Sequence, residues 1–589
     1  MTTAAPARPT RPSTTPATGD PAWRADARRT RARRHRTRLN CLLVAALALI
    51  GAAAFQISSS PSAEDTGTAV TDAARHRTWN GTRGAHPHAP RAGSVAATQT
   101  TAATPPPTEA SAPPAVPSSS APAPRPAAAP APAPAGVSVA SYGARADGRT
   151  DAAPAIRAAL AANQHVHIPA GEYLLETFES PRQTRLHADF MFSLRSGQTV
   201  TADPGAVLTF ADGIIPGSPT LWGGNLFMID GASDVTISGG TWDFNGANNL
   251  VPAGRTITGY GVYTYGADRV TVRDVTMQNT PGQNYIVMQG RGDGFRVEGS
   301  TFVNGGTSLA ANREQVDYSA MYFTGSNVVV DRVRITHDRL PWFYSGGIEL
   351  HGTRNAVTNS VIERSFPAVY IGPDVASELE VMEDTVVTGN QFLEVGRAVT
   401  FHALGTGAIA GVEFARNTVT MTSFPGLGAG RGVDQDAPPD GNWTYHHIIT
   451  GLDIRDNDFH DADGQSDFGI RLSQIHSGTI QQNRFHQMSG TVFQLGGSPW
   501  DTRNVTFSDN SATWLGSTGA PAIALGLDGY RADGIVVTRN RITRTQAEGS
   551  ACGVYSDGVI TSSSVTGNGF AGIGLPMCGP TMGSLAFAP

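Results

Sequence analysis

The chain has 589 residues, of which 40% are hydrophobic and 16% are charged, and its formal net charge is −6 at pH 7. All 43 basic residues are arginine, which excludes lysine Schiff-base chemistry and any lysine acid or base. Fifteen arginines and six of the 49 acidic residues precede Val137, so the remainder carries about −15. That negative charge excludes a basic surface for binding nucleic acid. It also disfavours a highly anionic polymer as the ligand, unless arginines cluster locally.

The amino-terminal part of the chain is typical of an exported protein. Residues 1–38 form an arginine-rich region that we expect to be disordered, and residues 39–57 form an apolar segment. Its uninterrupted part, Leu42–Phe55, is short for a spanning helix and fits a signal-peptide core, with Ala52 and Ala54 as a small-x-small cleavage pattern. Cleaved secretion and an uncleaved membrane anchor both remain open. Either one places the rest of the chain outside the cytoplasm.

A linker connects this segment to the folded part. Residues 58–136 are polar and then rich in proline and alanine, which predicts a disordered, extended spacer. Residues 137–589 are the expected folded domain. Membrane contact is expected only through the amino-terminal segment.

The first folded stretch, Tyr142–Leu175, reads YGARADGRTDAAPAIRAALAANQHVHIPAGEYLL. Its expected features are a turn at Asp147-Gly148, a helix cap at Thr150 or Asp151, Pro154 in the first helical turn, an apolar stripe of Ile156 and Leu160, and a strand over His165–Ile168. The stretch resembles the amino-terminal signature of the pectate-lyase superfamily of right-handed parallel β-helices. That superfamily includes polygalacturonase-like hydrolases and epimerase-like proteins, in which the short helix covers the open end of the solenoid. The resemblance implies the fold and says little about the reaction.

A repeat from Ile237 onward predicts the same fold independently. An apolar residue is followed three positions later by Asn, Gly, Ser or Val and two positions later by another apolar residue, with successive anchors about 25 to 40 residues apart. We therefore expect an all-β chain forming a single right-handed parallel β-helix with a short capping helix. The recurring asparagines are interpreted as left-handed turn residues that stack in ladders. Interruptions of the repeat predict loops at 243–261, 305–317, 339–345 and 423–447.

Each coil contributes a second strand whose alternate positions line up as an outward column. Apolar residues lie between these positions and are expected to face the core. A column of tyrosines, amides and charged groups favours a sugar-binding trough over a plain solvated face. Its pairs are Tyr263 and Tyr265, Val287 and Gln289, Tyr322 and Thr324, Glu349 and His351, Tyr370 and Gly372, Thr400 and His402, Arg471 and Ser473, and Gln494 and Gly496.

Chemistry is expected at the strand that reads SGGIELHG, where Glu349 and His351 share one face. Cleavage of a glycosidic bond needs a general acid and a second carboxylate about 5 to 9.5 Å apart. Glu349 is the candidate acid, since tyrosines and apolar walls would raise its pKa. Candidates for the second carboxylate are Asp317, then Asp374, then Asp338. His351 and His402 would orient the substrate or a carboxylate, and Arg471 would bind a substrate hydroxyl or acid group.

Substrate binding is assigned to the column and to aromatic residues in the neighbouring loops. Exposed aromatic rings stack on sugar rings, although packing of the loops onto the barrel explains each aromatic residue equally well. The candidates are Gln289, Tyr322, Tyr370, His402, Arg471, Trp342, Tyr344 and Trp443.

Three functions fit these residues. The first is a monomeric glycoside hydrolase that needs no metal or other cofactor and acts on a polysaccharide. The second is a lyase or epimerase, in which His351, His402 or Tyr370 removes a C5 proton and Arg471 or Ca²⁺ neutralises a uronate carboxylate. The third is a non-catalytic glycan-binding surface protein.

The family resemblance transfers no catalytic residue. The polygalacturonase set of paired aspartates, Gly-His-Gly and Arg-x-Lys is absent from the sequence, as is the Asp-Pro-His-Asp run of alginate epimerases. Near the end of the chain, Cys552 and Cys578 lie about one repeat apart, so adjacent strands would bring them within reach of a disulfide.

Overall fold

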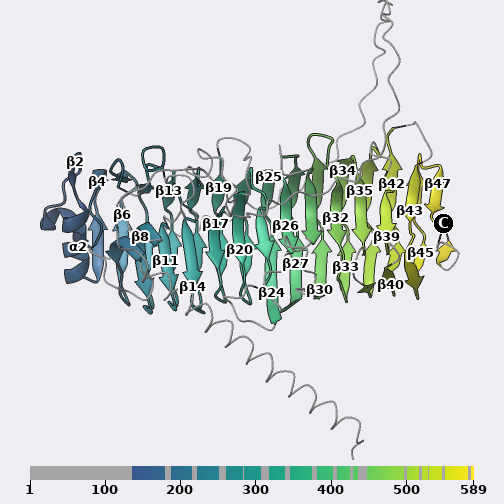
Figure 1. Cartoon of the computed structure of the whole chain (residues 1–589), viewed down its shortest axis with the longest axis horizontal. Coiled ribbons are helices and arrows are strands. Elements are labelled where there is room, and N and C mark those ends of the chain that lie inside the picture. Colours follow the sequence, from purple (N-terminus) through teal and green to yellow (C-terminus); the bar gives the residue numbers. More distant parts are fainter. Residues whose placement is uncertain are drawn as a thin grey trace, which may run out of the picture. The chain divides into compact units, whose positions relative to one another are not determined.

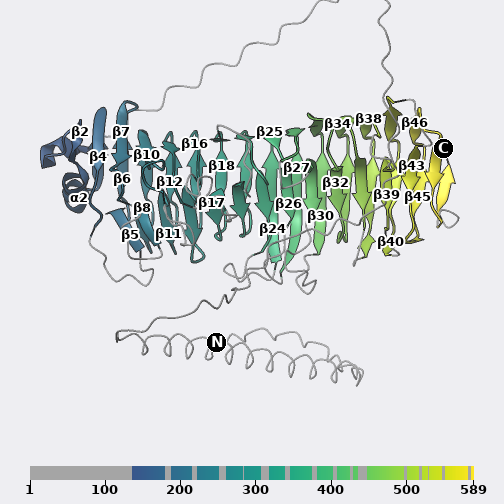
Figure 2. The same cartoon turned by 45° about the horizontal axis from the view of Figure 1, so that its top comes forward.

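The computed structural model of the chain describes residues 136–179, 188–214, 222–250, 260–282, 284–306, 318–337, 345–373, 381–401, 407–424, 429–435, 448–496, 501–516, 520–527, 530–546, 551–580 and 585–588. The described residues form a parallel β-helix, as the repeat predicted. Figures 1 and 2 show successive strands of each sheet side by side, from α2 at one end to β47 at the other. Residues 1–135 lie outside the described residues, so the basic region, the apolar segment and the linker remain predictions. No helix in the described ranges is long and apolar enough to cross a membrane.

Three long parallel sheets make up the described β-helix. The first has 16 strands in the order β1 (Val137–Ser138), β3 (His165–Ile168), β6 (Thr199–Ala202), β9 (Thr236–Ser238), β12 (Thr271–Arg273), β15 (Arg296–Glu298), β18 (Val329–Asp331), β21 (Ala356–Thr358), β24 (Val381–Thr388), β27 (Ala408–Ala415), β30 (Ile449–Arg455), β33 (Gly478–Gln481), β37 (Val505–Ser508), β41 (Val536–Thr538), β45 (Ser564–Thr566) and β48 (Ala586–Ala588).

The second sheet has 15 described strands in the order β2 (Asp147–Asp151), β4 (Gly171–Leu175), β7 (Ala206–Phe210), β10 (Thr241–Asp243), β13 (Thr276–Gln278), β16 (Thr301–Val303), β19 (Arg334–Thr336), β22 (Val361–Glu363), β25 (Gln391–Val395), β28 (Thr418–Met421), β31 (Asp458–Asp461), β34 (Arg484–Met488), β38 (Ser511–Trp514), β42 (Arg541–Arg544) and β46 (Gly569–Ala571).

The third sheet has 14 described strands in the order β5 (Ala188–Ser193), β8 (Trp222–Asp230), β11 (Val262–Tyr265), β14 (Ile286–Gln289), β17 (Tyr318–Phe323), β20 (Ser345–Leu350), β23 (Val369–Ile371), β26 (Arg397–Phe401), β29 (Arg431–Gln435), β32 (Phe468–Leu472), β35 (Thr491–Leu495), β39 (Ile523–Leu525), β43 (Cys552–Tyr555) and β47 (Leu575–Cys578). A short fourth sheet pairs β36 (Thr502–Arg503), β40 (Arg531–Asp533) and β44 (Val559–Thr561).

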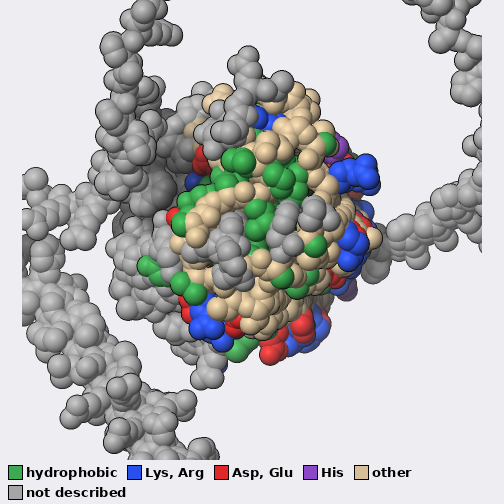
Figure 3. Space-filling view, turned by 90° about the vertical axis from the view of Figure 1, so that its right-hand side faces the viewer, with side chains coloured by type: hydrophobic (Ala, Val, Ile, Leu, Met, Phe, Trp, Pro, Cys, Tyr) green, Lys and Arg blue, Asp and Glu red, His purple; other side chains and the backbone are tan. Residues whose placement is uncertain are grey.

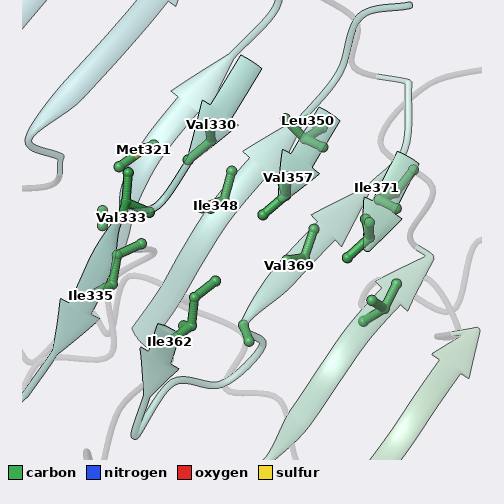
Figure 4. Packing of buried hydrophobic residues seen from close by; sticks show 14 of the residues in the cluster. Met321, Val330, Val333, Ile335, Ile348, Leu350, Val357, Ile362, Val369 and Ile371 are labelled. Carbon is green, nitrogen blue, oxygen red and sulfur yellow. The ribbon is translucent and has the colours of Figure 1, made fainter. Parts of the chain in front are cut away.

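The core lies between the three long sheets and is filled by every second residue of each strand. Ile348 and Leu350 on β20 are fully buried, and the register places Ile348 between Met321 and Val369 of the adjacent strands. Because parallel strands stack in register, each apolar side chain packs on the equivalent side chain of the next rung. Figure 4 shows these residues of the 14-stranded sheet meeting Val330 and Val357 of the 16-stranded sheet and Ile335 and Ile362 of the 15-stranded sheet.

A short helix covers the amino-terminal end of the described β-helix, as predicted. The 3-10 turn η1 (Val139–Tyr142) precedes helix α2 (Ala153–Ala162), which has Pro154 in its first turn and buries Ile156 and Leu160. The N-cap position is Ala152, one residue after Asp151, which was one of the two predicted caps. The Asp151 carboxylate nevertheless accepts a hydrogen bond of 3.0 Å from the amide of Ala153, the first helical residue.

The predicted turn at Asp147-Gly148 lies at the start of strand β2, where the register with β4 is irregular. Gly148 has a positive φ of 64°, and the Asp147 carboxylate accepts hydrogen bonds from the Arg149 and Thr150 amides at 3.0 and 2.8 Å. The predicted strand at His165–Ile168 is confirmed as β3.

The predicted asparagine ladder is present and buried. Each side-chain amide donates to the Oδ1 atom of the next asparagine at 2.9–3.1 Å, through Asn390, Asn417, Asn457, Asn483, Asn510, Asn540 and Asn568. The expectation of left-handed backbone at these asparagines is wrong by one position. The residue before each one has the positive φ, namely Gly389, Arg416, Asp456, Gln482, Asp509, Arg539 and Gly567. Left-handed backbone turns the corner, and the asparagine that follows satisfies the buried polar groups.

Replacing Asn483 with alanine is expected to destabilise the β-helix by about 3 kcal/mol, since each buried polar group left unsatisfied costs about 1–3 kcal/mol. Its amide nitrogen donates to the Ile454 carbonyl at 2.9 Å, and its Oδ1 accepts from the Asn457 backbone amide at 3.1 Å. Urea unfolding of the full chain measures the loss. The control is Gln481→Ala at the end of β33, two residues before Asn483, where the side chain is half-buried and outward. Equal losses in the two variants would contradict the role of the ladder.

One predicted loop contains a strand of the 14-stranded sheet. The interval 423–447 was expected to be an insertion, but β29 lies within it and pairs with β26 and β32 as a full rung. The predicted loops 305–317 and 339–345 fall mostly in ranges that are not described, namely 307–317 and 338–344. Of the predicted loop 243–261, residues 251–259 are not described.

The last described rungs contain the disulfide between Cys552 on β43 and Cys578 on β47, with the two Cα atoms 6.1 Å apart. It closes a 26-residue separation between neighbouring strands. Seen from this end, hydrophobic and uncharged side chains occupy the end face and charged ones lie around its rim (Figure 3).

Candidate functional site

The outward face of the 14-stranded sheet brings the predicted column together. Strand register aligns its residues in the order Tyr263, Val287, Tyr322, Glu349, Tyr370, Thr400, Asp434, Arg471 and Gln494. Neighbours along such a column are separated by the strand spacing of about 4.8 Å. The sequence-based alignment omitted Asp434, which stands between Thr400 and Arg471.

Glu349 on β20 lies beside His351, the first residue after that strand. Glu349 Oε2 is 3.3 Å from His351 Nε2, and His351 Nδ1 is 2.6 Å from the carbonyl oxygen of Gly372. His351 is fully buried, and Glu349 is 5% exposed. The acid and the imidazole are therefore one buried hydrogen-bonded pair.

The geometry fixes how many protons this pair carries. A carbonyl oxygen only accepts, so His351 Nδ1 holds a proton and donates it to Gly372. The contact between Nε2 and Oε2 then needs one further proton, which belongs either to the imidazole or to the carboxyl group. The pair thus holds one transferable proton on the outward face of the sheet.

Tyrosine rings enclose this pair on both sides. The His351 ring centroid is 4.8 Å from that of Tyr322 and 5.4 Å from that of Tyr370. Tyr322 belongs to the preceding rung and Tyr370 to the following one, each in register with Glu349. Rings held in this way present apolar faces next to the proton-bearing groups.

A second hydrophobic cluster lies outside the main core, on the outward side of the first rungs of the same sheet. It contains Phe190, Met228, Tyr260, Tyr263 and Val287, with Tyr265 and Tyr322 packed against it. Burial raises the pKa of Tyr263 to about 12, so its hydroxyl stays protonated at neutral pH. That hydroxyl donates a hydrogen bond of 2.8 Å to Gln289 Oε1. The side chain of the candidate Gln289 is therefore fixed by Tyr263 of the preceding rung.

Three arginines surround a fully buried aspartate farther along the column. Arg471 binds Asp434 through two hydrogen bonds, Nε to Oδ1 at 2.6 Å and Nη2 to Oδ2 at 3.1 Å. Arg431 Nη1 donates to Oδ2 at 2.9 Å, and Arg397 Nε lies 3.5 Å from the same oxygen. Burial alone would raise the pKa of Asp434, but Arg471, Arg397 and Arg431 together hold that pKa well below its usual range.

Among the described residues of this group, the guanidinium groups outnumber the carboxylates. Arg431 also reaches Asp467 Oδ2 at 3.2 Å, which still leaves three guanidinium groups against two carboxylates. Arg431 and Arg471 keep 19% and 24% of their side-chain surface exposed. The described residues thus gather three arginines on the outward column of an acidic domain, about three rungs or roughly 14 Å from Glu349 by strand spacing.

A three-residue pattern in the sequence marks Asp434 as a member of the column. A glycine, a β-branched residue and an outward residue recur on this sheet as Gly347-Ile348-Glu349, Gly432-Val433-Asp434 and Gly469-Ile470-Arg471. A Cβ atom on Gly347 would lie 2.3 Å from the Ala368 carbonyl oxygen, and one on Gly432 would lie 2.3 Å from that of Gly469. The close approach of successive rungs therefore requires glycine, and this triplet marks a rung of the column.

Several candidates lie outside the described residues. These are the second-carboxylate candidates Asp317, Asp374 and Asp338, the column residue His402, and the loop aromatics Trp342, Tyr344 and Trp443. Within the described column, Asp434 is the next carboxylate after Glu349, and roughly 14 Å exceeds the range of about 5–9.5 Å for a glycosidase pair. The described column therefore supplies no second carboxylate within glycosidase range of Glu349.

Comparisons with known proteins identify the fold. Residues 136–339 match a family described as rhamnogalacturonase A/epimerase, pectate lyase-like, and residues 445–577 match a right-handed beta helix region. The tailspike protein of E. coli bacteriophage HK620 in complex with a pentasaccharide has a TM-score of 0.57 and 15% identity over 74% of this chain and 78% of that chain. A double mutant of that tailspike, also in complex with pentasaccharide, has a TM-score of 0.56 and 14% identity over 74% and 78%.

No curated protein matches the sequence. An identity this low to the solved structures establishes the fold and leaves the reaction to the residues of the site. The chain has the fold of a right-handed parallel β-helix, and its residues 136–339 are similar to the pectate lyase-like family.

Proposed function

We propose that the protein is an exported carbohydrate-active enzyme that cleaves a polysaccharide by hydrolysis, with Glu349 as the general acid. The observation that carries this proposal is the buried pair of Glu349 and His351, which holds one transferable proton between tyrosine rings on the outward column. The pentasaccharide complexes of the tailspike structures support a glycan as the ligand of such a solenoid. The arginine-rich region and the apolar segment support action outside the cytoplasm.

In this mechanism the glycan lies along the column, parallel to the stack of rungs. Glu349 gives its proton to the leaving glycosidic oxygen, and a second carboxylate stabilises the sugar or activates water. His351, fixed by the Gly372 carbonyl, orients the Glu349 carboxyl group before the transfer, and the pair takes up a proton from water before the next turnover. Asp317 and Asp374 remain our candidates for the second carboxylate, and the enzyme would act as a monomer without a metal at this site.

A lyase or epimerase is the second candidate, and the arginine patch around Asp434 favours it. Guanidinium groups recognise carboxylates, so a uronate could lie against Arg471 and Arg431. His351 or Tyr370 would then remove the C5 proton of a uronate farther along the glycan, two to three rungs or roughly 10–14 Å from the arginines, and Ca²⁺ would neutralise the carboxylate of that sugar. The third candidate, a glycan-binding surface protein, would use the same face without turnover.

Product analysis separates these functions. The full chain is incubated with a panel of neutral and uronate-containing polysaccharides, and reducing ends, ultraviolet absorbance and sugar configuration are followed together. Hydrolysis gives new reducing ends without absorbance, whereas a lyase also gives an absorbing unsaturated product. Inversion at C5 without cleavage would identify an epimerase. Binding without any turnover across the panel would contradict an enzyme.

A further inference from the structure

Two histidines stack face to face on the 15-stranded sheet, away from the column that carries Glu349. Strands β31 and β34 pair in parallel register, which places His460 beside His486. Their ring centroids are 4.3 Å apart, and the ring planes differ by 6°. Asp458 precedes His460 by two positions on the same strand, so strand alternation directs its side chain to the same face.

Ligand atoms of these three side chains converge. Asp458 Oδ1 lies 2.5 Å from His486 Nε2 and 3.4 Å from His460 Nε2. One ligand atom from each residue can be chosen so that all three lie within 4.8 Å of one another. A tetrahedral ion with bonds of about 2.0–2.1 Å requires ligand atoms roughly 3.3 Å apart, which lies inside this spread. Small side-chain rotations therefore suffice to close the group around one ion.

We propose that Asp458, His460 and His486 bind a divalent first-row transition metal of the Zn²⁺ type. Two imidazoles and one carboxylate suit Zn²⁺, Ni²⁺ or Cu²⁺, whereas Ca²⁺ and Mg²⁺ prefer oxygen ligands alone. The side chains of Asp458, His460 and His486 are 35%, 41% and 40% exposed, so an ion can enter from solvent and water can complete its coordination.

The surroundings of the group allow an ion. Thr420 is in register with His460 on the preceding rung, and Arg484 is in register with Asp458 on the following one. A positive charge one rung away disfavours a cation, so affinity for the ion rests chiefly on the two imidazoles. A bound ion would link two adjacent rungs through residues far apart in sequence and would stabilise the folded chain by mass action. The proposal does not rest on the proposed function, because the Glu349 column lies on a different sheet.

The test compares variants of the full chain, because the sequence contains 15 histidines and total metal uptake is not informative by itself. Wild type, His486→Gln, His460→Gln and the control His165→Gln are treated with chelator and then titrated with Zn²⁺ by calorimetry. His165 is exposed on β3 of the 16-stranded sheet. The chelator-treated forms are also compared by circular dichroism, which shows that each variant is folded.

We expect wild type and His165→Gln to bind one more equivalent of Zn²⁺ than either variant of the pair. Both should also show a Zn²⁺-dependent rise in Tm that His486→Gln and His460→Gln lack, and Ca²⁺ should not replace Zn²⁺. His460 and His486 are replaced separately, so if one variant fails to fold, the other variant still tests the metal site. Equal uptake and equal Tm changes in all four proteins would overturn the proposed site.

Discussion

Replacing Asp434 with asparagine is expected to lower the free energy of unfolding at pH 7 by about 3 kcal/mol, near the lower end of the range of about 3–5 kcal/mol for breaking a buried ion pair. The carboxylate is fully buried and accepts from Arg471 and Arg431. Asparagine keeps the size of the side chain but removes its charge, which leaves three guanidinium groups facing one another. The partial exposure of Arg431 and Arg471 lets water offset some of the cost.

Urea unfolding of the full chain measures this loss, with Asp509→Asn as the matched control. Arg539 binds Asp509 through two hydrogen bonds of 2.7 Å, but that pair lies at the surface. Exposed pairs contribute little, so the control should unfold close to wild type. Similar losses in the two variants would contradict the importance of burial at Asp434.

The same carboxylate predicts how stability changes with acid. Its arginine partners hold the pKa of Asp434 below the unfolded value of about 3.9. A lowered pKa contributes stability that is fully present above the unfolded value and is lost as the pH falls through the folded value. The stability difference between wild type and Asp434→Asn should therefore be constant above about pH 5 and shrink below about pH 4. A constant difference down to the lowest accessible pH would show that the charge of Asp434 is not its cause.

Replacing Glu349 with glutamine is expected to lower kcat for glycan cleavage by about 10²–10⁴, the usual contribution of a positioned proton donor. Glutamine has the same shape, and its amide can donate to His351 Nε2, so the fold and glycan binding should be retained. An amide cannot deliver the proton, so KM should change little while kcat falls. Steady-state kinetics on a cleaved polysaccharide, together with calorimetric binding, separates the two effects.

The control for this variant is Glu363→Gln on β22. Glu363 belongs to the 15-stranded sheet, where it pairs with Arg334 at 2.7 Å. This change should leave kcat and binding unaltered. If Glu349→Gln retained wild-type kcat, Glu349 would not be the general acid.

The repeat predicted the fold because each coil buries the same few positions. Val357, Val387 and Phe414 hold the same position of the repeat, and the strand register stacks them on successive rungs. The ladder of asparagines followed from the same pattern. The pattern did not predict which residue has the left-handed backbone. Arg416 and Asp456 have positive φ, although arginine and aspartate are not diagnostic of that conformation.

The site was less accessible to sequence reasoning. Glu349 and His351 stood out because a buried strand rarely carries two ionisable groups, yet their mutual hydrogen bond depends on the position of the Gly372 carbonyl on the next coil. Asp434 was missed because β29 is surrounded by a long interval without the repeat. Its arginine partners come from three different rungs, so only the register brings them together.

The most direct test of the central claim is a crystal structure of the full-length Glu349→Gln variant with an oligosaccharide from the polysaccharide that wild type cleaves. We predict that the sugar lies along the outward face of the 14-stranded sheet, with the scissile glycosidic oxygen within about 3 Å of the side-chain amide at position 349. Neighbouring sugar rings should lie beside Tyr322 and Tyr370. An oligosaccharide bound on another sheet, or with its scissile bond away from position 349, would contradict the account.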